Sequence, residues 1–393
     1  MKSTISTRPA GHCKRILRAL GVPALALFLV ACSSDNDGDF EPPVVLPFQE
    51  LYDQGITRYI GMYSPSTTET DGNITRYSFG VGDGPLCLDG TAYNMATRDT
   101  GSRDLVIFLQ GGGARWSELD SAFDSAPPGL PAIGLLNPDQ PGNPVANWNV
   151  VYLPYCDGGL HASDKDNDYD GDGDVESPQR GLHNLSAALD VALSSFPNPR
   201  RILLTGVSGG GFGTTFALPL VRFQYPDVPI ELINDSGVGV GRPDGINADQ
   251  PADMRMPDGA DFLRLLQEDW NQSAFLPASC PNCIAEDGHF SDYQDWQLEQ
   301  DPDVRRAYLS YAQDAVIGNF FLGITGAEFE DALLEEVRQM EDAHPDRVRY
   351  WIPDGTGHTF LLSGLDVTAG GVTALDWVTA MLDDTDAWVS VRD

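Results

Sequence analysis

Short apolar runs alternate with stretches of helical spacing along most of the chain. The predicted strands comprise residues 104–110, 148–155, 201–205, 229–234, 303–311 and 347–352, of which 104–110 is a continuous apolar run typical of a buried strand. The stretches with the helical repeat comprise residues 182–196, 212–223, 329–340 and 372–382. Strands that alternate with helices predict an α/β fold, with a mainly parallel sheet flanked by helices. Residues 56–80 and 91–97 alternate between apolar and polar positions and predict additional antiparallel strands before it.

The first 31 residues differ from the rest of the chain. Five basic residues accompany an apolar run of 12 residues at Ala19–Val30. A membrane-spanning helix needs about 20 residues, and this pattern is typical of a signal peptide. The run ends in Leu29-Val30-Ala31-Cys32, which looks like a bacterial lipobox. We expect cleavage before Cys32 and lipidation of Cys32; the alternative is an ordinary secretory signal.

The segment after this leader reads as a tether followed by one domain. Ser33, in place of aspartate, favours sorting to the outer membrane, so we expect a lipid-anchored protein of the bacterial cell envelope. Residues 33–39 are polar and acidic and Pro42 and Pro43 follow them, so we expect residues 32–48 to form a flexible tether. Residues 49–393 show no internal repeat and no second linker, so we expect a single, monomeric catalytic domain.

The charge is strongly acidic. The chain has 24 basic and 58 acidic residues, and without the leader the balance is 19 against 58, a net charge of −39. Such a surface repels nucleic acid and anionic lipid, so the membrane is expected to be contacted only through the anchor. We interpret the charge as adaptation to a saline exterior; an acidic periplasmic protein without such adaptation is the alternative.

A serine stands among glycines where the strand at 201–205 gives way to a helix. Gly206-Val207-Ser208-Gly209-Gly210 fits G-x-S-x-G, the turn that places a nucleophilic serine at the carboxyl edge of a sheet. Chance matches are common, and Gly-rich turns also serve structure alone. Here a strand precedes the motif and a helix follows it, which is the context that a nucleophile requires. Ser208 is therefore the candidate nucleophile.

A nucleophilic serine needs a histidine base and an acid. In hydrolases that carry the serine on such a turn, the three residues occur along the chain in the order serine, acid, histidine. His358 is the histidine that follows the strand at 347–352, and we expect it to be the base. For the acid, Asp314 follows one strand end and is preferred, Asp235 ends the preceding strand, and either could instead cap a helix. Backbone N–H groups of Gly112, Gly113 and Gly209 are expected to form the oxyanion hole.

Five segments together resemble a known family: Asp89–Tyr93, Leu109–Trp116, Leu153–Cys156, Arg180–Asn184 and Gly206–Gly211. In this order they resemble the pectin acetylesterase and Notum family of serine carboxylesterases. The resemblance implies an α/β-hydrolase fold with Ser208, an acid near Asp314 and His358, and no required cofactor. Gly209 stands where members often have alanine, and Ala114 where they often have cysteine. Plant members deacetylate pectin and Notum removes a fatty acyl group, so the substrate stays open.

Four cysteines remain after Cys13 and Cys32 are set aside. An even number in an exported chain favours disulfides. Of the three pairings allowed, we expect Cys280–Cys283 and Cys87–Cys156. The resemblance also implies the second pair.

An aspartate-rich segment follows at residues 166–174. Asp166, Asp168, Asp170 and Asp172, with a glycine at the sixth place, resemble a calcium loop. Position twelve is Ser177 and not an acid, so a regular EF-hand is excluded. The hypothesis of a structural Ca²⁺ site stands beside that of a solvated acidic loop.

The sequence as a whole predicts a serine carboxylesterase that acts on a small or polymeric ester, with acetyl or another short acyl group. Two alternatives stay open: a hydrolase of lipid or polyester acyl esters, and a catalytically silent cell-surface binding protein of the same fold.

Overall fold

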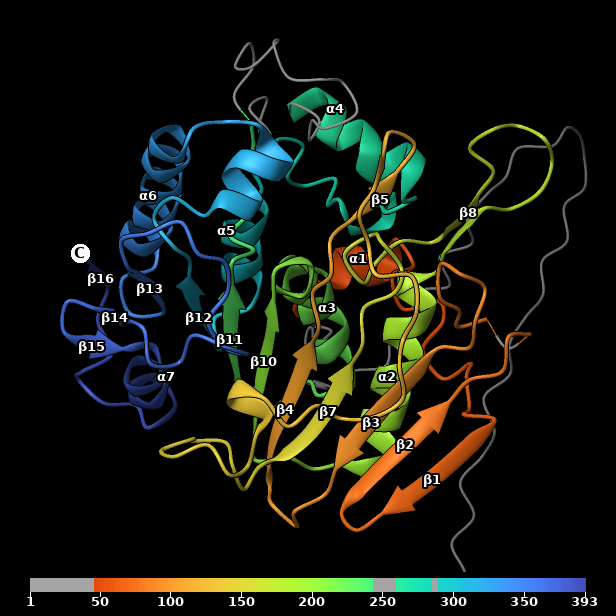
Figure 1. Cartoon of the computed structure of the whole chain (residues 1–393), viewed down its shortest axis with the longest axis horizontal. Coiled ribbons are helices and arrows are strands. Elements are labelled where there is room, and N and C mark those ends of the chain that lie inside the picture. The colour runs from red at the N-terminus through yellow and green to blue at the C-terminus, as the bar shows by residue number, and fades with distance from the viewer. Residues whose placement is uncertain (1–45, 83, 243–258, 285–288) are drawn as a thin grey trace, which may run out of the picture. The chain divides into compact units, whose positions relative to one another are not determined.

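Ten strands form one sheet in the order β1-β2-β3-β7-β4-β10-β11-β12-β13-β16 in the computed structural model (Figure 1). Their bounds are β1 Thr67–Asp71, β2 Ile74–Ser78, β3 Asn94–Arg98, β4 Asp104–Leu109, β7 Asn149–Leu153, β10 Arg201–Val207, β11 Ile230–Asp235, β12 Val304–Leu309, β13 Val348–Ile352 and β16 Val391–Arg392. The first three strands pair antiparallel, and β3 is antiparallel to β7. From β7 to β16 every neighbour is parallel. This arrangement confirms the predicted α/β-hydrolase-like fold.

The structure describes residues 46–82, 84–242, 259–284 and 289–393. The predicted signal peptide at 1–31, Cys32 and nearly all of the tether at 32–48 lie outside these residues. Residues 45–393 cluster into one unit. Within the described ranges, no helix combines the length and the apolar character that crossing a membrane would need.

Helices cover both faces of the sheet. They are α1 Gln49–Asp53, α2 Gly181–Ser195, α3 Gly209–Gln224, α4 Gly259–Arg264, α5 Ser291–Gln300, α6 Gly326–Ala343 and α7 Ala374–Leu382. Successive side chains of a strand point to opposite faces. Leu105, Ile107 and Leu109 of β4 therefore pack with residues of α2 and α3. Val106 and Phe108 pack in a second core with residues of α7.

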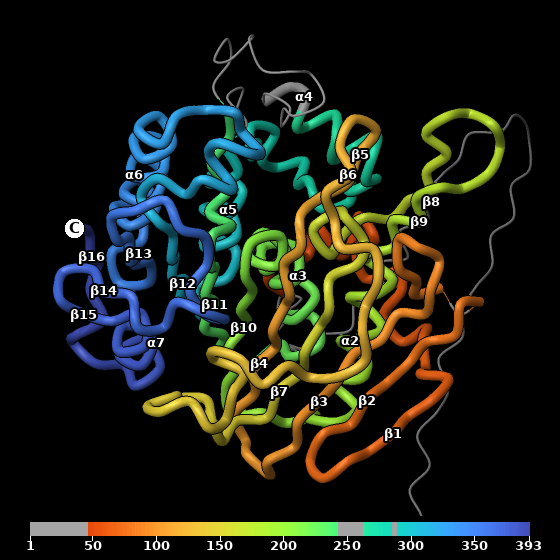
Figure 2. Tube along the Cα trace, in the orientation of Figure 1, coloured from red at the N-terminus to blue at the C-terminus, as the bar shows by residue number. Residues whose placement is uncertain are grey.

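Short strands and short helices lie outside the main sheet and its covering helices. They are the strands β5 Arg115–Trp116, β6 Leu119–Asp120, β8 Lys165–Asn167, β9 Ser177–Gln179, β14 Thr368–Ala369 and β15 Val372–Thr373, and the short helices η1 Gly134–Leu136, η3 Leu265–Asp269, η4 Ser273–Phe275 and η5 Ala315–Leu322. The tube in Figure 2 shows the β8–β9 hairpin with a loop that projects outward. The expectation of strands over residues 56–66 was wrong, because that stretch forms turns before β1.

Both expected disulfides are present. Cys87 is bonded to Cys156, and Cys280 to Cys283. The first joins the segment before β3 to the loop that follows β7. It therefore ties two segments together at the end of the sheet where parallel strands finish, which is where ligands bind in such folds.

Candidate active site

Ser208 occupies a strained turn between β10 and α3. Its φ is 54° and its ψ is −123°, in a region that side-chain-bearing residues rarely adopt. Its N–H donates to the carbonyl oxygen of Asp235 at 2.8 Å, and its carbonyl accepts from the N–H of Phe212 at 3.0 Å. These contacts hold the turn in place. The serine lines two cavities at the carboxyl edge of the sheet.

The glycines of the motif are required by close approaches of the backbone. A Cβ added to Gly206 would lie 2.2 Å from the carbonyl oxygen of Gly210, and one added to Gly210 would lie 2.2 Å from that of Leu109. A Cβ on Gly111 would lie 2.1 Å from the carbonyl oxygen of Val207. Larger residues at these positions would push the turn away from β4, so the motif reflects steric need.

The Gly111–Gly113 loop places backbone donors beside Ser208. Within the described residues, the N–H groups of Gly112 and Gly113 make no hydrogen bond. Gly209 is the first residue of α3, and the first N–H groups of a helix have no partner inside it. Gly113 and Gly209 line one cavity with Ser208, and Gly112 lines the other. Donors in this position can bind the oxyanion of a tetrahedral intermediate.

His358, which is partly exposed, pairs with the fully buried Asp314. Nδ1 of His358 lies 2.7 Å from Oδ2 of Asp314, and as an N–H it donates to that carboxylate. The other oxygen of Asp314 accepts from the N–H groups of Val316 and Ile317 at 2.9 and 3.1 Å. The aspartate thus caps η5 and orients the imidazole as well, which leaves Nε2 of His358 available to a serine. His358 and Ser208 line the same cavity, with no hydrogen bond between them in the structure.

Asp235, the alternative acid, has a different set of partners. Its Oδ2 accepts from the N–H groups of Phe360 at 2.7 Å and Leu361 at 2.8 Å. Complete burial raises the pKa of Asp235 to about 7, and the two N–H donors and His358 oppose that rise. The carboxyl group fixes the segment that follows His358. It makes no hydrogen bond to the imidazole among the described residues.

The other described histidines have structural partners. His161 is buried, and its Nε2 lies 2.8 Å from the carbonyl oxygen of Gln110. His183 joins Tyr63 and Asp164 at 2.6 and 2.8 Å. His344 lies 2.6 Å from Asp295, and His289 is 3.7 Å from Glu336. Of these five, only His358 shares a cavity with Ser208.

Ser208 lies where a small and a large cavity meet. The small one has about 20 Å³ of free space and is lined by apolar residues, among them Phe212, Trp270 and Ile317. That space admits about one water- or methyl-sized group. The large one has about 440 Å³ and reaches His358 and the glycine loop. Phe321 lines both. Sequence reasoning missed these apolar residues, because no local motif marks residues that approach the serine from distant segments.

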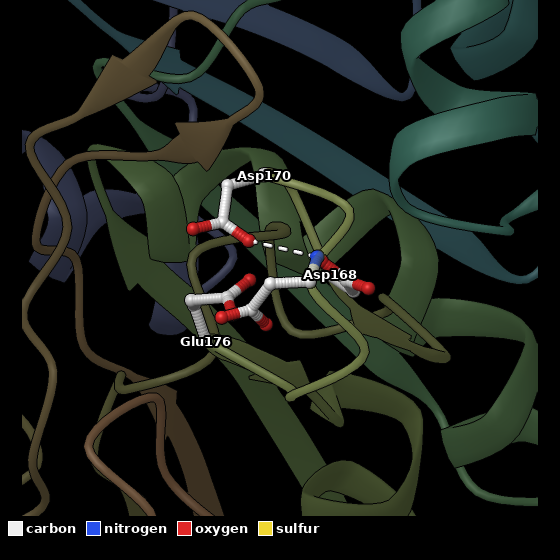
Figure 3. A group of neighbouring side chains, drawn as sticks. Asp168, Asp170 and Glu176 are labelled. Carbon is white, nitrogen blue, oxygen red and sulfur yellow. Dashed lines mark hydrogen bonds between the residues drawn. The ribbon is translucent and has the colours of Figure 1, made fainter.

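The aspartate-rich segment forms the loop of the β8–β9 hairpin. Carboxylate oxygens of Asp168, Asp170, Asp172 and Glu176 lie within 4.8 Å of one another, and Figure 3 shows three of these side chains converging. Asp166, which was expected to take part, lies outside this cluster, and its carboxylate accepts from Arg180 at 2.6 and 2.8 Å. The hairpin turns Glu176 back onto the loop in its place. Carboxylates so arranged suit Ca²⁺, and all four are exposed.

The calcium hypothesis predicts a shift in melting temperature. An ion that binds only the folded state stabilises it by about 2.7 kcal/mol at 100 times its Kd. We therefore expect the melting temperature to be higher in Ca²⁺ than in EDTA, when both are measured at one fixed NaCl concentration. Asp168→Asn should remove the difference, whereas Asp166→Asn should keep it. Identical melts of the unmodified protein would identify a solvated acidic loop.

Comparison with known proteins adds the following. Residues 67–254 match the family model described as Pectinacetylesterase. Pectin acetylesterase 4 of Arabidopsis thaliana is 30% identical over 169 residues, which are 39% of this chain and 41% of the relative. The chain therefore aligns with about two fifths of the length of this curated relative. The matched family segment contains the glycine loop and Ser208 and ends before Asp314 and His358, whose placement rests on the structure alone. Over residues 67–254 the chain is therefore similar to the pectinacetylesterase family.

Proposed function

We propose that the protein is a serine carboxylesterase that hydrolyses esters of acetyl and other short acyl groups. Ser208 is the nucleophile, His358 the general base and Asp314 its orienting acid. The observation that carries the proposal is the position of Ser208, which lies in a strained turn between free N–H donors and the His358–Asp314 pair. The match to a family described as Pectinacetylesterase supports the same reaction class.

In the acylation step, Oγ of Ser208 attacks the ester carbonyl carbon while Nε2 of His358 takes the hydroxyl proton. The carbonyl oxygen becomes an oxyanion that accepts from Gly209 and from the glycine loop. The imidazolium is stabilised by Asp314 and returns its proton to the leaving alcohol, whose bond to the acyl carbon breaks. The serine–histidine hydrogen bond absent from the structure is of the kind that often forms only with substrate bound.

In the deacylation step, water enters from the larger cavity and attacks the acyl-serine. His358 takes a proton from the water, the oxyanion forms in the same place, and the proton returns to Oγ of Ser208. The products are a carboxylic acid, an alcohol and the original enzyme. The two steps use only the ester, one water molecule and groups of the chain, so the reaction needs no cofactor.

The smaller cavity predicts the acyl preference. Among p-nitrophenyl esters we expect kcat/KM to be highest for acetate and to fall about tenfold or more by octanoate, since a longer chain must displace packed side chains. Ile317→Ala should move the optimum to longer acyl groups, because it removes atoms from the wall of that cavity. The chain-length series on both proteins measures this.

The control for that series is Leu333→Ala. Leu333 is also buried but lies on α6, outside the wall of the cavity. Both substitutions should destabilise the fold by about 2–5 kcal/mol. Only Ile317→Ala should change the acyl preference. An unmodified enzyme that prefers octanoate would contradict the assignment of the smaller cavity to the acyl group.

We propose further that the mature protein is a monomer held in the bacterial cell envelope by a lipid on Cys32. Support comes from the lipobox-like residues 29–32, which lie outside the described part of the chain. In a bacterial host, Cys32→Ser should move the protein from the membrane fraction to the soluble fraction. Membrane retention of that variant would contradict the anchor.

A further inference from the structure

We infer that the alcohol part of the substrate, which we call the carrier, is an uncharged carbohydrate held against the exposed rings of Phe123 and Phe320. Polyuronates are therefore disfavoured as carriers. This inference rests on the proposed function and names the substrate class of the same site. It departs from the carrier that the name of the matched relative suggests.

Two aromatic rings stand at the open side of the larger cavity. Phe123 is 53% exposed and Phe320 is 40% exposed, and both line that cavity together with His358. Exposed apolar side chains gathered at a site mark a binding surface. A flat ring offers the apolar C–H face of a sugar a large, rigid contact area. The two rings therefore suit a carbohydrate beside the scissile ester.

Phe123 is held in place by the backbone of the glycine loop. The backbone N–H of Phe123 donates to the carbonyl oxygen of Gly112 at 2.7 Å. A Cβ added to Gly112 would lie only 2.4 Å from the ring. Phe123 thus covers Gly112, so a carrier that contacts this ring also lies next to the oxyanion loop.

In the described part of the chain, no cationic side chain lines the cavities beside Ser208, because their walls contain no lysine or arginine. Carboxylate ligands are recognised by arginine forks or lysine ammonium groups. Arg115 follows the glycine loop, but its guanidinium lies 3.4 Å from the carboxylate of Asp120. A uronate carboxylate that bound here would therefore lose its hydration without forming an ion pair in exchange.

Phe123, which lines the larger cavity, lies in the acidic segment 118–124, which we call the rim. Glu118, Asp120 and Asp124 lie in the segment between the glycine loop and the residue after Phe123, and all three are exposed. The whole chain carries a net charge of −34. A field of one sign lowers the local concentration of ligands of that sign, and salt screens the effect. A polyanionic carrier would be repelled before it reached Ser208.

The test uses one polymer in two charge states. Highly methyl-esterified, acetylated pectin is nearly uncharged, and removal of its methyl esters makes it a polyanion with the same backbone and acetyl groups. At low salt, we expect kcat/KM for acetate release to be at least about tenfold higher on the methylated polymer. The ratio should shrink as NaCl is raised. Equal rates, faster release from the polyanion, or a ratio independent of salt would overturn the inference.

Two pairs of variants locate the cause. The double variant Glu118→Gln, Asp124→Asn should lower the ratio of kcat/KM on the methylated polymer to that on the polyanion by about threefold, because two negative charges at the rim are removed. Glu69→Gln with Asp71→Asn makes the same charge change on β1, at the outer edge of the sheet, and should leave the ratio unchanged. A ratio that responds equally to both pairs would mean that the rim has no special role.

The aromatic contact has its own variant. Phe320→Ala should raise KM for neutral acetylated xylan about five- to tenfold. Phe223→Ala removes a similarly exposed ring from the far end of α3 and should leave that KM unchanged. An unchanged KM in Phe320→Ala would overturn the carbohydrate contact.

Hydrolysis of p-nitrophenyl acetate by the unmodified enzyme separates the two proposals. If the enzyme does not hydrolyse this ester, the proposed function is contradicted. If it does, but prefers the polyanionic polymer, only the inference about the carrier is contradicted.

Discussion

Ser208→Ala should lower kcat for ester hydrolysis by about 10⁶-fold, to the level left by binding and the oxyanion donors alone. The hydroxyl of Ser208 forms the covalent bond in this mechanism, whereas the hydroxyl of Ser121, in the wall of the same cavity, donates to the carbonyl oxygen of Ala114. The measurement is the steady-state rate on p-nitrophenyl acetate. Retention of more than a few per cent of the activity would contradict a serine mechanism.

The matched control for this substitution is Ser236→Ala. Ser236 also follows a strand and has a positive φ of 59°, and its Oγ accepts from the N–H of Thr359 at 3.1 Å. It contacts no reacting atom, so its loss should reduce kcat by less than about tenfold. Ser208→Ala should melt as the unmodified protein does, and a phosphonate ester should label only Ser208.

Asp314→Asn should lower kcat by about 10⁴-fold. The amide would keep the contact with His358 but would favour the wrong imidazole tautomer and leave the imidazolium without a counter-charge. One oxygen remains to accept from the N–H groups of Val316 and Ile317, so we expect the cap of η5 to persist. Single-turnover rates on p-nitrophenyl acetate would test this; an unchanged rate would exclude Asp314 as the acid.

Asp235→Asn is the control that distinguishes the two aspartates. Its effect on kcat should be small, and its effect on stability should depend on pH. Burial raises the pKa of Asp235 from 3.8 to about 7, so between these values the folded state holds a proton that the unfolded state has lost. The free energy of unfolding therefore falls with rising pH by about 1.4 kcal/mol per unit. Asparagine has no such proton, so the variant should gain stability relative to the unmodified protein from pH 4 to pH 7.

Part of this site could be predicted from the chain alone. The positions of β4, β10, β11, β12 and β13 follow from short runs rich in apolar residues, because strands covered on both faces are mostly apolar. Ser208 could be recognised because the turn that carries it imposes a steric demand for glycine on its nearest neighbours in sequence. Such local requirements are visible in a sequence, since the residues that meet are only a few positions apart.

Other features depend on where distant segments meet. Asp235 ends β11 and Asp314 follows β12, and the sequence pattern favours Asp314 without showing its contacts. The path of the chain after β13 brings His358 to Asp314 and the backbone of Phe360 to Asp235. Pairing of β8 with β9 places Glu176 among the aspartates, while Arg180 pairs with Asp166. The apolar cavity beside Ser208 combines Leu160, Trp270 and Ile317. Tertiary packing decided these contacts, because side-chain distances between remote segments depend on the whole fold and on no single stretch of sequence.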